Sequence, residues 1–438
     1  MEAIVEEALI VKYPAYKDSG VEWLGDVPSH WKIVSLGSLL ELKSDKNHPD
    51  YEVLSVYREY GVIPKDSRDD NHNATSLDTT NYKAVEPGDL VVNKMKAWQG
   101  SMGISGHKGI VSPAYITCKV TSREVYSKYL HQLLRSNSYI GEYNRISYGV
   151  RVGQWDMHYE DFKKVITLLP PKEEQTAIAQ FLDRKTAQID KAIAIKVKQI
   201  ELLKERRQIL IHNAVIRGLN PEVPMKDSGV EWIGEIPMHW KLTQIKKIAL
   251  TTSGGTPPSG NVDRYYNGHI PWVRTTDLNN DELFDVPEKI TDNAIRDTAC
   301  KLVPENTVCV AMYGGPGTIG KHAILRIKAT LNQALCGIVG SEKLHSEFLY
   351  YYIKFCRPYW MIGAKGTRID PNINQDEVRN MAITLPPKSE QIAISEYISD
   401  ASGKIIKAIT LKEKETEKLQ EYKASLINSA VTGKIKVC

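Results

Sequence analysis

The segment Gly315–Lys321, with the sequence GPGTIGK, has the spacing of a phosphate-binding loop. Such a loop holds phosphates on its backbone N–H groups, and a Ser or Thr directly after its lysine binds Mg²⁺. Here His322 follows the lysine, and HAILRIKA from His322 onward is typical of a strand, whereas a phosphate-binding loop leads into a helix. We therefore expect no nucleotide to bind at this segment, and a self-sufficient ATPase is kept only as an alternative.

No convincing set of residues for other catalysis stands out. A DNA methyltransferase needs Asn or Asp before two prolines and an aromatic residue after them, and the pairs that begin at Pro170 and Pro386 lack both neighbours. Neither a carboxylate cluster with a lysine, as in nucleases, nor a Ser, His and Asp arrangement is evident. The six cysteines form no CxxC pair, and no histidine cluster has metal-ligand spacing. We expect reduced cysteines packed in cores, no catalytic residue, no metal and no cofactor on this chain.

Two regions of the chain carry loops with residues suited to reading DNA. Arg can pair with guanine, and Asn or Gln with adenine, at the edge of the major groove. Lys, Ser, Thr and the N–H groups of glycine-rich loops can hold phosphates. In the first region the candidate DNA contacts are Lys94, Lys96, Trp98, Gln99, Tyr148, Arg151 and Gln154. In the second region they are Thr256, Arg274, Thr275, Tyr313, Lys365, Thr367, Arg368, Asn372 and Asn374.

Two of these arginines occupy matching positions. Arg151 follows Gly149, and Arg368 follows Gly366, at the same spacing. A basic residue kept at this place in otherwise divergent regions favours a shared DNA contact. A structural salt bridge is the alternative.

The chain contains the same motifs twice. A leading motif, KDSGVEW, occupies Lys17–Trp23 and again Lys226–Trp232, and it continues as LGDVPSHWK and IGEIPMHWK. ITLLPPKEEQ starts at Ile166 and ITLPPKSEQ at Ile383. Each half therefore has a leading motif, a divergent middle and a shared C-terminal segment. This repeat indicates one architecture with two specificities, although a duplication without functional meaning is also possible. The recurring tryptophans are interpreted as core anchors rather than base stackers: Trp23, Trp31, Trp232 and Trp240.

The shared C-terminal segments predict two long helices. Each begins at a Pro-Pro pair followed by glutamate, which suits a helix start, and glycine follows each expected end, at Gly218 and Gly433. Apolar residues form one heptad-like stripe on each helix. On the first helix the stripe consists of Ile178, Leu182, Ile189, Ile193, Ile200, Leu203 and Leu210. On the second helix it consists of Ile394, Ile398, Ile405, Ile409, Leu419 and Leu426.

A helix with one apolar stripe needs a partner, and the helix of the other repeat can provide it. If a pseudo-twofold axis relates the halves, the two helices form an antiparallel coiled coil; each helix packing on its own domain is the alternative. The globular regions mix strands (expected at 91–98, 109–120, 306–313 and 322–329) with helices (124–143 and 347–362), which predicts α/β or α+β domains. The expected segments are 1–169, 170–218, 219–385 and 386–438.

Composition is compatible with this organisation. A length of 438 residues, with 42% hydrophobic and 25% charged residues, is typical of a soluble protein with two or more domains. The net charge is only +4, so any nucleic acid must be bound by local patches. The N-terminus lacks a signal-peptide pattern and no apolar stretch is long enough to span a membrane, so we expect a cytoplasmic protein.

With these motifs the chain resembles the specificity subunits of type I restriction-modification systems. The resemblance rests on YPAYKDSGVEWLGDVPSHW, the glycine-rich variable region, the LPPKEEQ helix start and the second full copy, and it covers essentially the whole chain. It implies that each variable region is a target recognition domain reading one half of a bipartite double-stranded DNA site. It also implies that the coiled coil sets the separation of the half-sites.

The resemblance further implies the partners and cofactors. Two methyltransferase subunits, which bring S-adenosylmethionine, would dock along the helices, and translocase-nuclease subunits would bring ATP and Mg. Because the two recognition domains differ, the target should be asymmetric. A coiled-coil scaffold that binds no DNA is the main alternative, and a methylation-only system is a narrower version of the same function.

Overall fold

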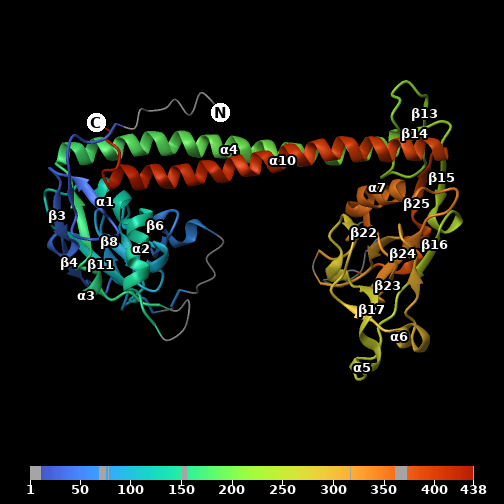
Figure 1. Cartoon of the computed structure of the whole chain (residues 1–438), viewed down its shortest axis with the longest axis horizontal. Helices are drawn as coiled ribbons and strands as arrows, with labels where there is room; N and C mark the ends of the chain where they lie inside the picture. The colour runs from blue at the N-terminus through green and yellow to red at the C-terminus, as the bar shows by residue number, and fades with distance from the viewer. Residues whose placement is uncertain are drawn as a thin grey trace. The chain divides into compact units, whose positions relative to one another are not determined.

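The structure, a computed structural model, describes residues 11–68, 75–76, 78–149, 155–315, 317–360 and 372–437. It divides into two compact units (Figure 1). The first unit comprises residues 1–197 and 413–438, and the second comprises residues 198–412. Each unit combines one globular region with parts of both long helices. We call the globular part the recognition region, which lies before α4 in the first unit and between α4 and α10 in the second.

The first unit is built on short antiparallel strand pairs. Its main sheet has the order β4-β11-β8-β9, with β4 Leu40–Lys43, β11 Tyr115–Val120, β8 Leu90–Asn93 and β9 Met102–Ile104. Four two-stranded pairs surround it: β1 Tyr16–Asp18 with β2 Asp26–Pro28, β3 Lys32–Ser35 with β12 Ile166–Leu169, β5 Leu54–Tyr57 with β6 Gly61–Pro64, and β7 Lys83–Val85 with β10 Gly109–Val111. The helices of this region are α1 Ser127–Leu134, α2 Asn137–Ile146 and α3 Tyr159–Phe162.

The second unit repeats this plan with a larger sheet. The sheet has the order β16-β24-β21-β22-β18, with β16 Leu250–Ser253, β24 Leu335–Val339, β21 Val308–Ala311, β22 His322–Leu325 and β18 Glu282–Leu283. A second sheet has the order β19-β17-β23-β20, with β19 Lys289–Ile290, β17 Tyr266–Val273, β23 Ala329–Leu331 and β20 Leu302–Val303. The remaining pairs are β13 Met225–Asp227 with β14 Glu235–Pro237 and β15 Lys241–Gln244 with β25 Ala382–Leu385. The helices are α5 Val262–Tyr265, α6 Asp292–Asp297, α7 Ser346–Cys356 and α9 Gln375–Asn380.

The strand pairings distinguish between the two expected fold classes. In the second unit β18 runs parallel to β22 and β17 runs parallel to β23, while the other named pairs in both units are antiparallel. Short antiparallel strands with helices packed beside them correspond to α+β.

The two shared segments are long helices, as predicted. Helix α4 spans Lys172–Arg217 and α10 spans Lys388–Val431, which are 46 and 44 residues. Each starts directly after its Pro-Pro pair. Gly218 (φ +77°) and Gly433 (φ +72°) follow the helix ends in the left-handed conformation, which glycine adopts without strain.

The helices run antiparallel within each unit. In the first unit Lys196 lies 2.5 Å from Glu415, and Asp190 lies 2.6 Å from Lys423, so one residue number falls as the other rises. In the second unit Ile211, near the end of α4, shares a core with Ile394, near the start of α10. The helices pair with each other and also pack on the recognition regions, because each core includes residues of both helices.

The predicted stripe lies on the inner side of each helix. Its buried members are Ile178, Leu182, Ile189, Ile200, Ile394, Ile398 and Ile405. Its half-buried members are Ile193, Leu203, Leu210, Ile409, Leu419 and Leu426. Outside the stripe, Ile195 and Ile209 are exposed, whereas Ile211, Val215 and Ile216 are buried in the core of the second unit.

Several predicted elements are shorter than the sequence patterns suggested. The expected strand over 91–98 ends at Asn93, since a turn and a short 3-10 helix, η3 Ala97–Gln99, follow it. The expected strand over 109–120 is two strands, because Pro113 lies between them and cannot donate a ladder hydrogen bond. The helix expected over 124–143 is broken into α1 and α2. The strand expected after Lys321 is confirmed as β22, so the GPGTIGK segment does not lead into a helix.

The tryptophans of the leading motif anchor the cores. Trp31 and Trp240 are fully buried, which confirms that interpretation for both. Trp23 and Trp232 are half-buried and contact Tyr139 and Tyr359, with ring centroids 4.9 and 5.1 Å apart. The cysteines at 118, 300, 309, 336 and 356 are buried free thiols. Over the described residues, no helix is long and apolar enough to cross a membrane.

Candidate nucleic-acid interface

A buried glutamine joins the recognition region to the long helix in the first unit. The Gln175 side-chain amide donates hydrogen bonds to the carbonyl oxygens of Glu124 (2.9 Å) and Pro170 (2.8 Å). Its side-chain oxygen accepts from the backbone N–H of Tyr126 at 2.8 Å, directly before α1. The side chain is fully buried, so these three bonds fix the start of α1 to the start of α4.

The second unit repeats this joint atom for atom. The Gln391 amide donates to the carbonyl oxygens of Lys343 and Pro386, both at 2.9 Å, and its oxygen accepts from His345 N–H at 2.8 Å. Sequence reasoning quoted this glutamine within the repeated helix start but gave it no role. The sequence signal that could have indicated this role is the presence of the glutamine in both copies, shortly after the Pro-Pro pair.

A glutamate in the first turn of each long helix holds the leading motif. Glu174 accepts from the indole N–H of Trp31 at 3.1 Å and lies 2.8 Å from His30 Nε2. In the second unit Glu390 accepts from Trp240 Nε1 at 2.9 Å, and its other oxygen lies 2.8 Å from His239. The two units therefore share one frame, on which the divergent loops are built.

Two of the candidates described in the first unit, Lys94 and Tyr148, contact the segment 155–158. The Lys94 ammonium lies 2.8 Å from the Asp156 carboxylate, and the Lys94 carbonyl accepts from Met157 N–H at 3.0 Å. Tyr148 exchanges two backbone hydrogen bonds with Asp156, and its ring, on a side chain that is 56% exposed, stacks on His158 at 4.9 Å. This part of the loop presents an accessible aromatic face, whereas Lys94 has a carboxylate partner.

The remaining described candidates of this unit lie on or beside η3. Lys96 is exposed and forms no ion pair within the described ranges. Trp98 donates its indole N–H to Met95 O at 3.1 Å and meets Trp155 edge to face, 5.2 Å between centroids. Gln99 is half-buried. Arg151 and Gln154 lie outside the described residues, as do Lys365, Thr367 and Arg368 of the second unit.

In the second unit two groups of candidates meet at the segment Asn332–Ala334. The first group is Thr256, which hydrogen-bonds to the Gln333 side chain, and Arg274 with Thr275, which follow Val273. Asn332 N–H donates to Val273 O at 2.9 Å, and Met312 N–H donates to Ala334 O at 2.8 Å. The segment Asn332–Ala334 therefore joins the two groups, and Gln333 is an additional candidate of the adenine-reading type.

The second group consists of Tyr313, Asn372 and Asn374. The backbone N–H of Ile373 donates to Met312 O at 2.9 Å, which places both asparagines beside Tyr313. Asn372 is exposed. Asn374 caps α9, because its side-chain oxygen accepts from Glu377 N–H at 3.0 Å. Burial raises the pKa of Tyr313, so its hydroxyl stays protonated and can donate.

Arg274 is engaged with carboxylates. Its guanidinium lies 3.4 Å from Asp277 and 3.3 Å from Glu288, and Asp277 also accepts from Arg274 N–H at 2.8 Å. These contacts start the short 3-10 helix η5 Thr275–Asp277. A contact from Arg274 to guanine would exchange at least one carboxylate for the base.

One exposed group in the first unit was missed by sequence reasoning. The turn Arg58–Tyr60 joins β5 to β6, Tyr60 is 50% exposed, and the Arg68 guanidinium lies 4.5 Å from its ring centroid. A basic residue over an exposed aromatic ring can contact a base or a phosphate. The sequence alone does not indicate this group, because Arg68 and Tyr60 come together only in the folded structure.

Comparison with known proteins gives the class of this fold and site. The family model described as "Type I restriction modification DNA specificity domain" matches residues 28–201 and 237–421, one stretch in each repeat. These stretches cover well over half of the chain, and the chain belongs to this family of type I restriction-modification specificity proteins.

Two relatives match along nearly the full length, and a third matches about half of the chain. The chain is 23% identical to a protein named putative type I restriction enzyme MjaX specificity subunit, from Methanocaldococcus jannaschii, over 94% of this chain and 96% of the relative. It is 24% identical to the MjaVIII specificity subunit of the same organism, over 94% of each. It is also 24% identical to the Escherichia coli EcoR124I/EcoR124II specificity subunit, over 49% of this chain and 47% of the relative.

Solved structures share the fold. A chain from work on complex assembly and conformational transition of the type I R-M system superposes with a TM-score of 0.72 at 14% identity, over 92% of this chain and 98% of that one. The HsdS subunit from Thermoanaerobacter tengcongensis superposes with a TM-score of 0.56 at 16% identity, over 93% and 98%. These likenesses show that the chain shares its overall fold with both of those chains.

Proposed function

We propose that each unit reads one half of a bipartite, asymmetric DNA target, and that the chain thereby directs methyltransferase and endonuclease subunits to that target. The observation that carries this proposal is the repeated joint. Gln175 and Gln391 make the same three hydrogen bonds in two units whose loops differ. A constant frame under divergent loops is the arrangement expected of two readers with different specificities.

The divergence of the loops supports unrelated half-sites. The second unit has an additional cluster of buried residues around β17, α5 and α6, formed by Tyr265, Ile270, Trp272, Ile290, Ala294 and Cys300. The first unit has the small cluster around the β5-β6 hairpin instead, formed by Leu54, Val56, Val62, Val85, Val91 and Val111. Loops supported on such different cores present different groups to DNA, so the two half-sites should differ in sequence.

Chemistry is assigned to partner subunits. The methyltransferase subunits would bring S-adenosylmethionine and flip the target adenine, and restriction subunits would bring ATP and Mg. Exposed apolar residues on the long helices, such as Leu202, Ile209 and Leu411 in the second unit, support docking of a methyltransferase subunit there. A net charge of +4 releases few counterions, so this chain alone should bind DNA weakly and act within a cytoplasmic complex.

The test is a long-read methylation map of cells that carry this chain with its cognate methyltransferase subunit. The expected result is a split, asymmetric motif with a fixed gap that disappears when the chain is deleted. The Arg368→Ala variant should relax or abolish one half of that motif only. Methylation that does not depend on the chain, despite an active and associated methyltransferase, would reject the proposal and favour a scaffold that binds no DNA.

A further inference from the structure

The helix that follows the glutamine joint carries, in each unit, a ring and a cation four residues apart. Counted from the helix start, His131 and Tyr350 are the fifth residues of α1 and α7. Lys354 is the ninth residue of α7, and Arg135 has the corresponding place as the C-cap residue directly after α1. Residues four apart lie on one face of a helix. The positions correspond because the glutamine joint holds the residue directly before each helix.

In the first unit this pair holds the turn between β5 and β6. The Arg135 guanidinium donates to the carbonyl oxygen of Arg58, and its other terminal nitrogen lies 2.6 Å from His131 Nε2. His131 Nδ1 accepts from the Ile104 N–H of β9 at 3.2 Å. Gly61 (φ +73°) closes the turn so tightly that a Cβ would lie 3.0 Å from His131 Cε1. The turn is therefore fixed on α1 by the bond from Arg135 to Arg58 O and by the packing of the His131 ring against Gly61.

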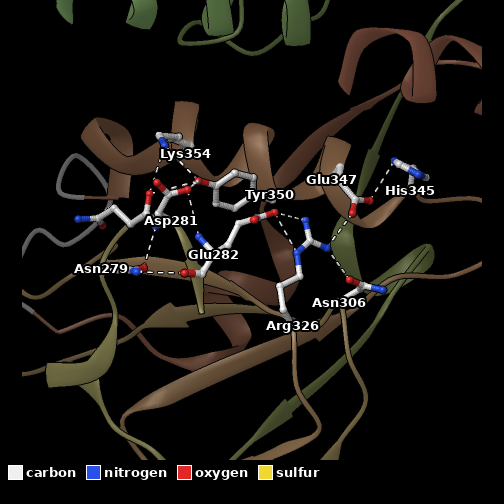
Figure 2. A network of polar contacts seen from close by, with 10 residues as sticks. Asn279, Asp281, Glu282, Asn306, Arg326, His345, Glu347, Tyr350 and Lys354 are labelled. Carbon is white, nitrogen blue, oxygen red and sulfur yellow. Dashed lines mark hydrogen bonds and ion pairs between the residues drawn. The ribbon is translucent and has the colours of Figure 1, made fainter. Parts of the chain in front are cut away.

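In the second unit the corresponding pair holds the turn before β18 (Figure 2). The Lys354 ammonium donates to Asn280 O at 3.2 Å and to the Tyr350 hydroxyl at 3.1 Å. The Tyr350 hydroxyl lies 3.2 Å from Asn280 O and 3.2 Å from Asp281 Oδ1. Asn280 has a φ of +61°, so this turn is also a tight one.

The far side of this second turn is held as well. The Arg326 guanidinium binds Glu282, the residue after Asp281, and lies 2.9 Å from Glu347 on α7 (Figure 2). The turn is thus attached to α7 through Lys354, Tyr350 and the Arg326–Glu347 pair. The corresponding helices, α1 and α7, therefore each anchor one turn of their own unit, with different side chains in the two units.

Both anchored turns adjoin candidate DNA contacts. In the first unit the turn itself carries Arg58 and Tyr60, which are exposed. In the second unit the turn lies just after η5 in the sequence, and η5 begins at Thr275 with Arg274 as its N-cap residue. A shift of either turn would move these side chains, and base recognition by hydrogen bonds tolerates little displacement.

We propose that Arg135 and Lys354 are positioning residues for sequence recognition, each of which holds the DNA-reading turn of its own unit. We call the pairs His131–Arg135 and Tyr350–Lys354 turn clamps. The proposal rests on the proposed function, because it assumes that each unit reads one half-site. It extends that function by naming side chains that act through the turn without contact with DNA.

The two turn clamps differ in their response to pH. Arg135 stays charged across the physiological range. Burial, together with the nearby Arg207 on α4, lowers the pKa of Lys354 to about 8, against the attraction of Asp281. The other groups close to this site are Tyr350 on the same helix, His322 on β22 and Arg357, which follows α7. As the pH rises through about 8, Lys354 loses its charge, and its bond to Asn280 loses the strength that the charge provides.

This titration does not by itself unfold the second unit. A free lysine has a pKa of about 10.4, so between about pH 8 and pH 10.4 the unfolded chain binds more protons at this residue than the folded chain. The contribution of Lys354 to the free energy of unfolding therefore increases with pH across that window. A loss of recognition above pH 8 would arise from the turn and not from loss of the fold at this residue.

The experiment uses this chain in complex with its cognate methyltransferase subunits. For each half-site we would measure a discrimination ratio, the Kd for a target with one substituted base pair divided by the Kd for the intact target. A substituted pair typically weakens binding by about 5- to 150-fold. Arg135→Met and Lys354→Met should each lower the ratio toward 1 in one half-site, by up to about tenfold, and the two variants should act on opposite half-sites. Lys247→Met, at an exposed lysine of the second unit, should change neither ratio.

Rescue and pH distinguish a positioning role from a general structural one. Lys354→Arg should restore the ratio that Lys354→Met lowers. Between about pH 7 and about pH 9 the wild-type ratio should fall only in the half-site affected by Lys354→Met, and Lys354→Arg should remove that fall. Ratios that fall equally in both half-sites, or in neither, would overturn the turn clamps. Failure of the proposed function is distinguishable, since no half-site would then be defined by the methylation map.

Discussion

Trp31 and Glu174 are joined by a hydrogen bond of 3.1 Å from the indole N–H to the carboxylate, although 143 residues separate them in the chain. Trp240 and Glu390 form the same bond at 2.9 Å, across 150 residues. Both tryptophans are fully buried. The leading motif at the start of each recognition region is therefore bonded to the long helix that follows the region. This bond is the same in both units, although their loops differ.

Replacement of Glu174 by Ala should destabilise the first unit. The variant removes a charge-assisted acceptor from the buried Trp31 N–H and the partner of His30. Loss of such a bond typically lowers the free energy of unfolding by about 1.5–3 kcal/mol. Glu173→Ala, at the exposed neighbour in the same helical turn, is the matched control. Urea denaturation of both variants measures the difference, and equal midpoints would contradict this role.

Replacement of Gln391 by Ala should destabilise the second unit by a comparable amount. The variant leaves the His345 N–H and the carbonyl oxygens of Lys343 and Pro386 without their partner in a buried place. An unsatisfied buried polar group costs about 1–3 kcal/mol. Gln420→Ala, on the exposed surface of α10, should be near neutral. A Gln391→Ala protein as stable as the Gln420→Ala protein would show that the joint is dispensable.

The sequence predicted the frame well because its signals are local. The Pro-Pro pairs mark the starts of α4 and α10, and Gly218 and Gly433 mark their ends, because the local preferences of proline and glycine determine these positions. The strand after Lys321 followed from its β-branched and aliphatic composition. Repetition of the leading motif indicated that Trp31 and Trp240 are structural.

The loops were predicted less well because their contacts are distant in sequence. The partner of Lys94 is Asp156, 62 residues further on, and the partners of Arg274 include Glu288. No local pattern predicts such ion pairs, since they depend on how strands register in space. The meeting of Thr256 with Gln333, 77 residues away, is of the same kind.

Replacement of Ile398 by Ala should strongly destabilise the second unit, because this stripe residue is fully buried in its core. Truncation of a buried isoleucine typically costs about 2–5 kcal/mol, from lost burial and the cavity left behind. Ile406→Ala, two turns later on α10 and 40% exposed, is the control. Thermal unfolding of the two variants compares them directly. Similar losses at both positions would mean that the stripe does not define the buried face.

Acidification should destabilise the second unit through His322. Burial lowers the pKa of His322 to about 4, and the nearby Lys354 and Arg357 act in the same direction. A free histidine has a pKa of about 6.5, so between these values the unfolded chain binds more protons than the folded chain. The stability that neutral His322 provides is complete above about pH 6.5 and is lost as the pH falls toward 4.

His322→Phe should remove this component, which amounts to on the order of 3 kcal/mol. Unfolding free energies of both proteins, measured from about pH 7 down to about pH 4, should therefore converge as the pH falls. Parallel curves would mean that His322 is protonated in the folded protein at neutral pH or keeps its ordinary pKa.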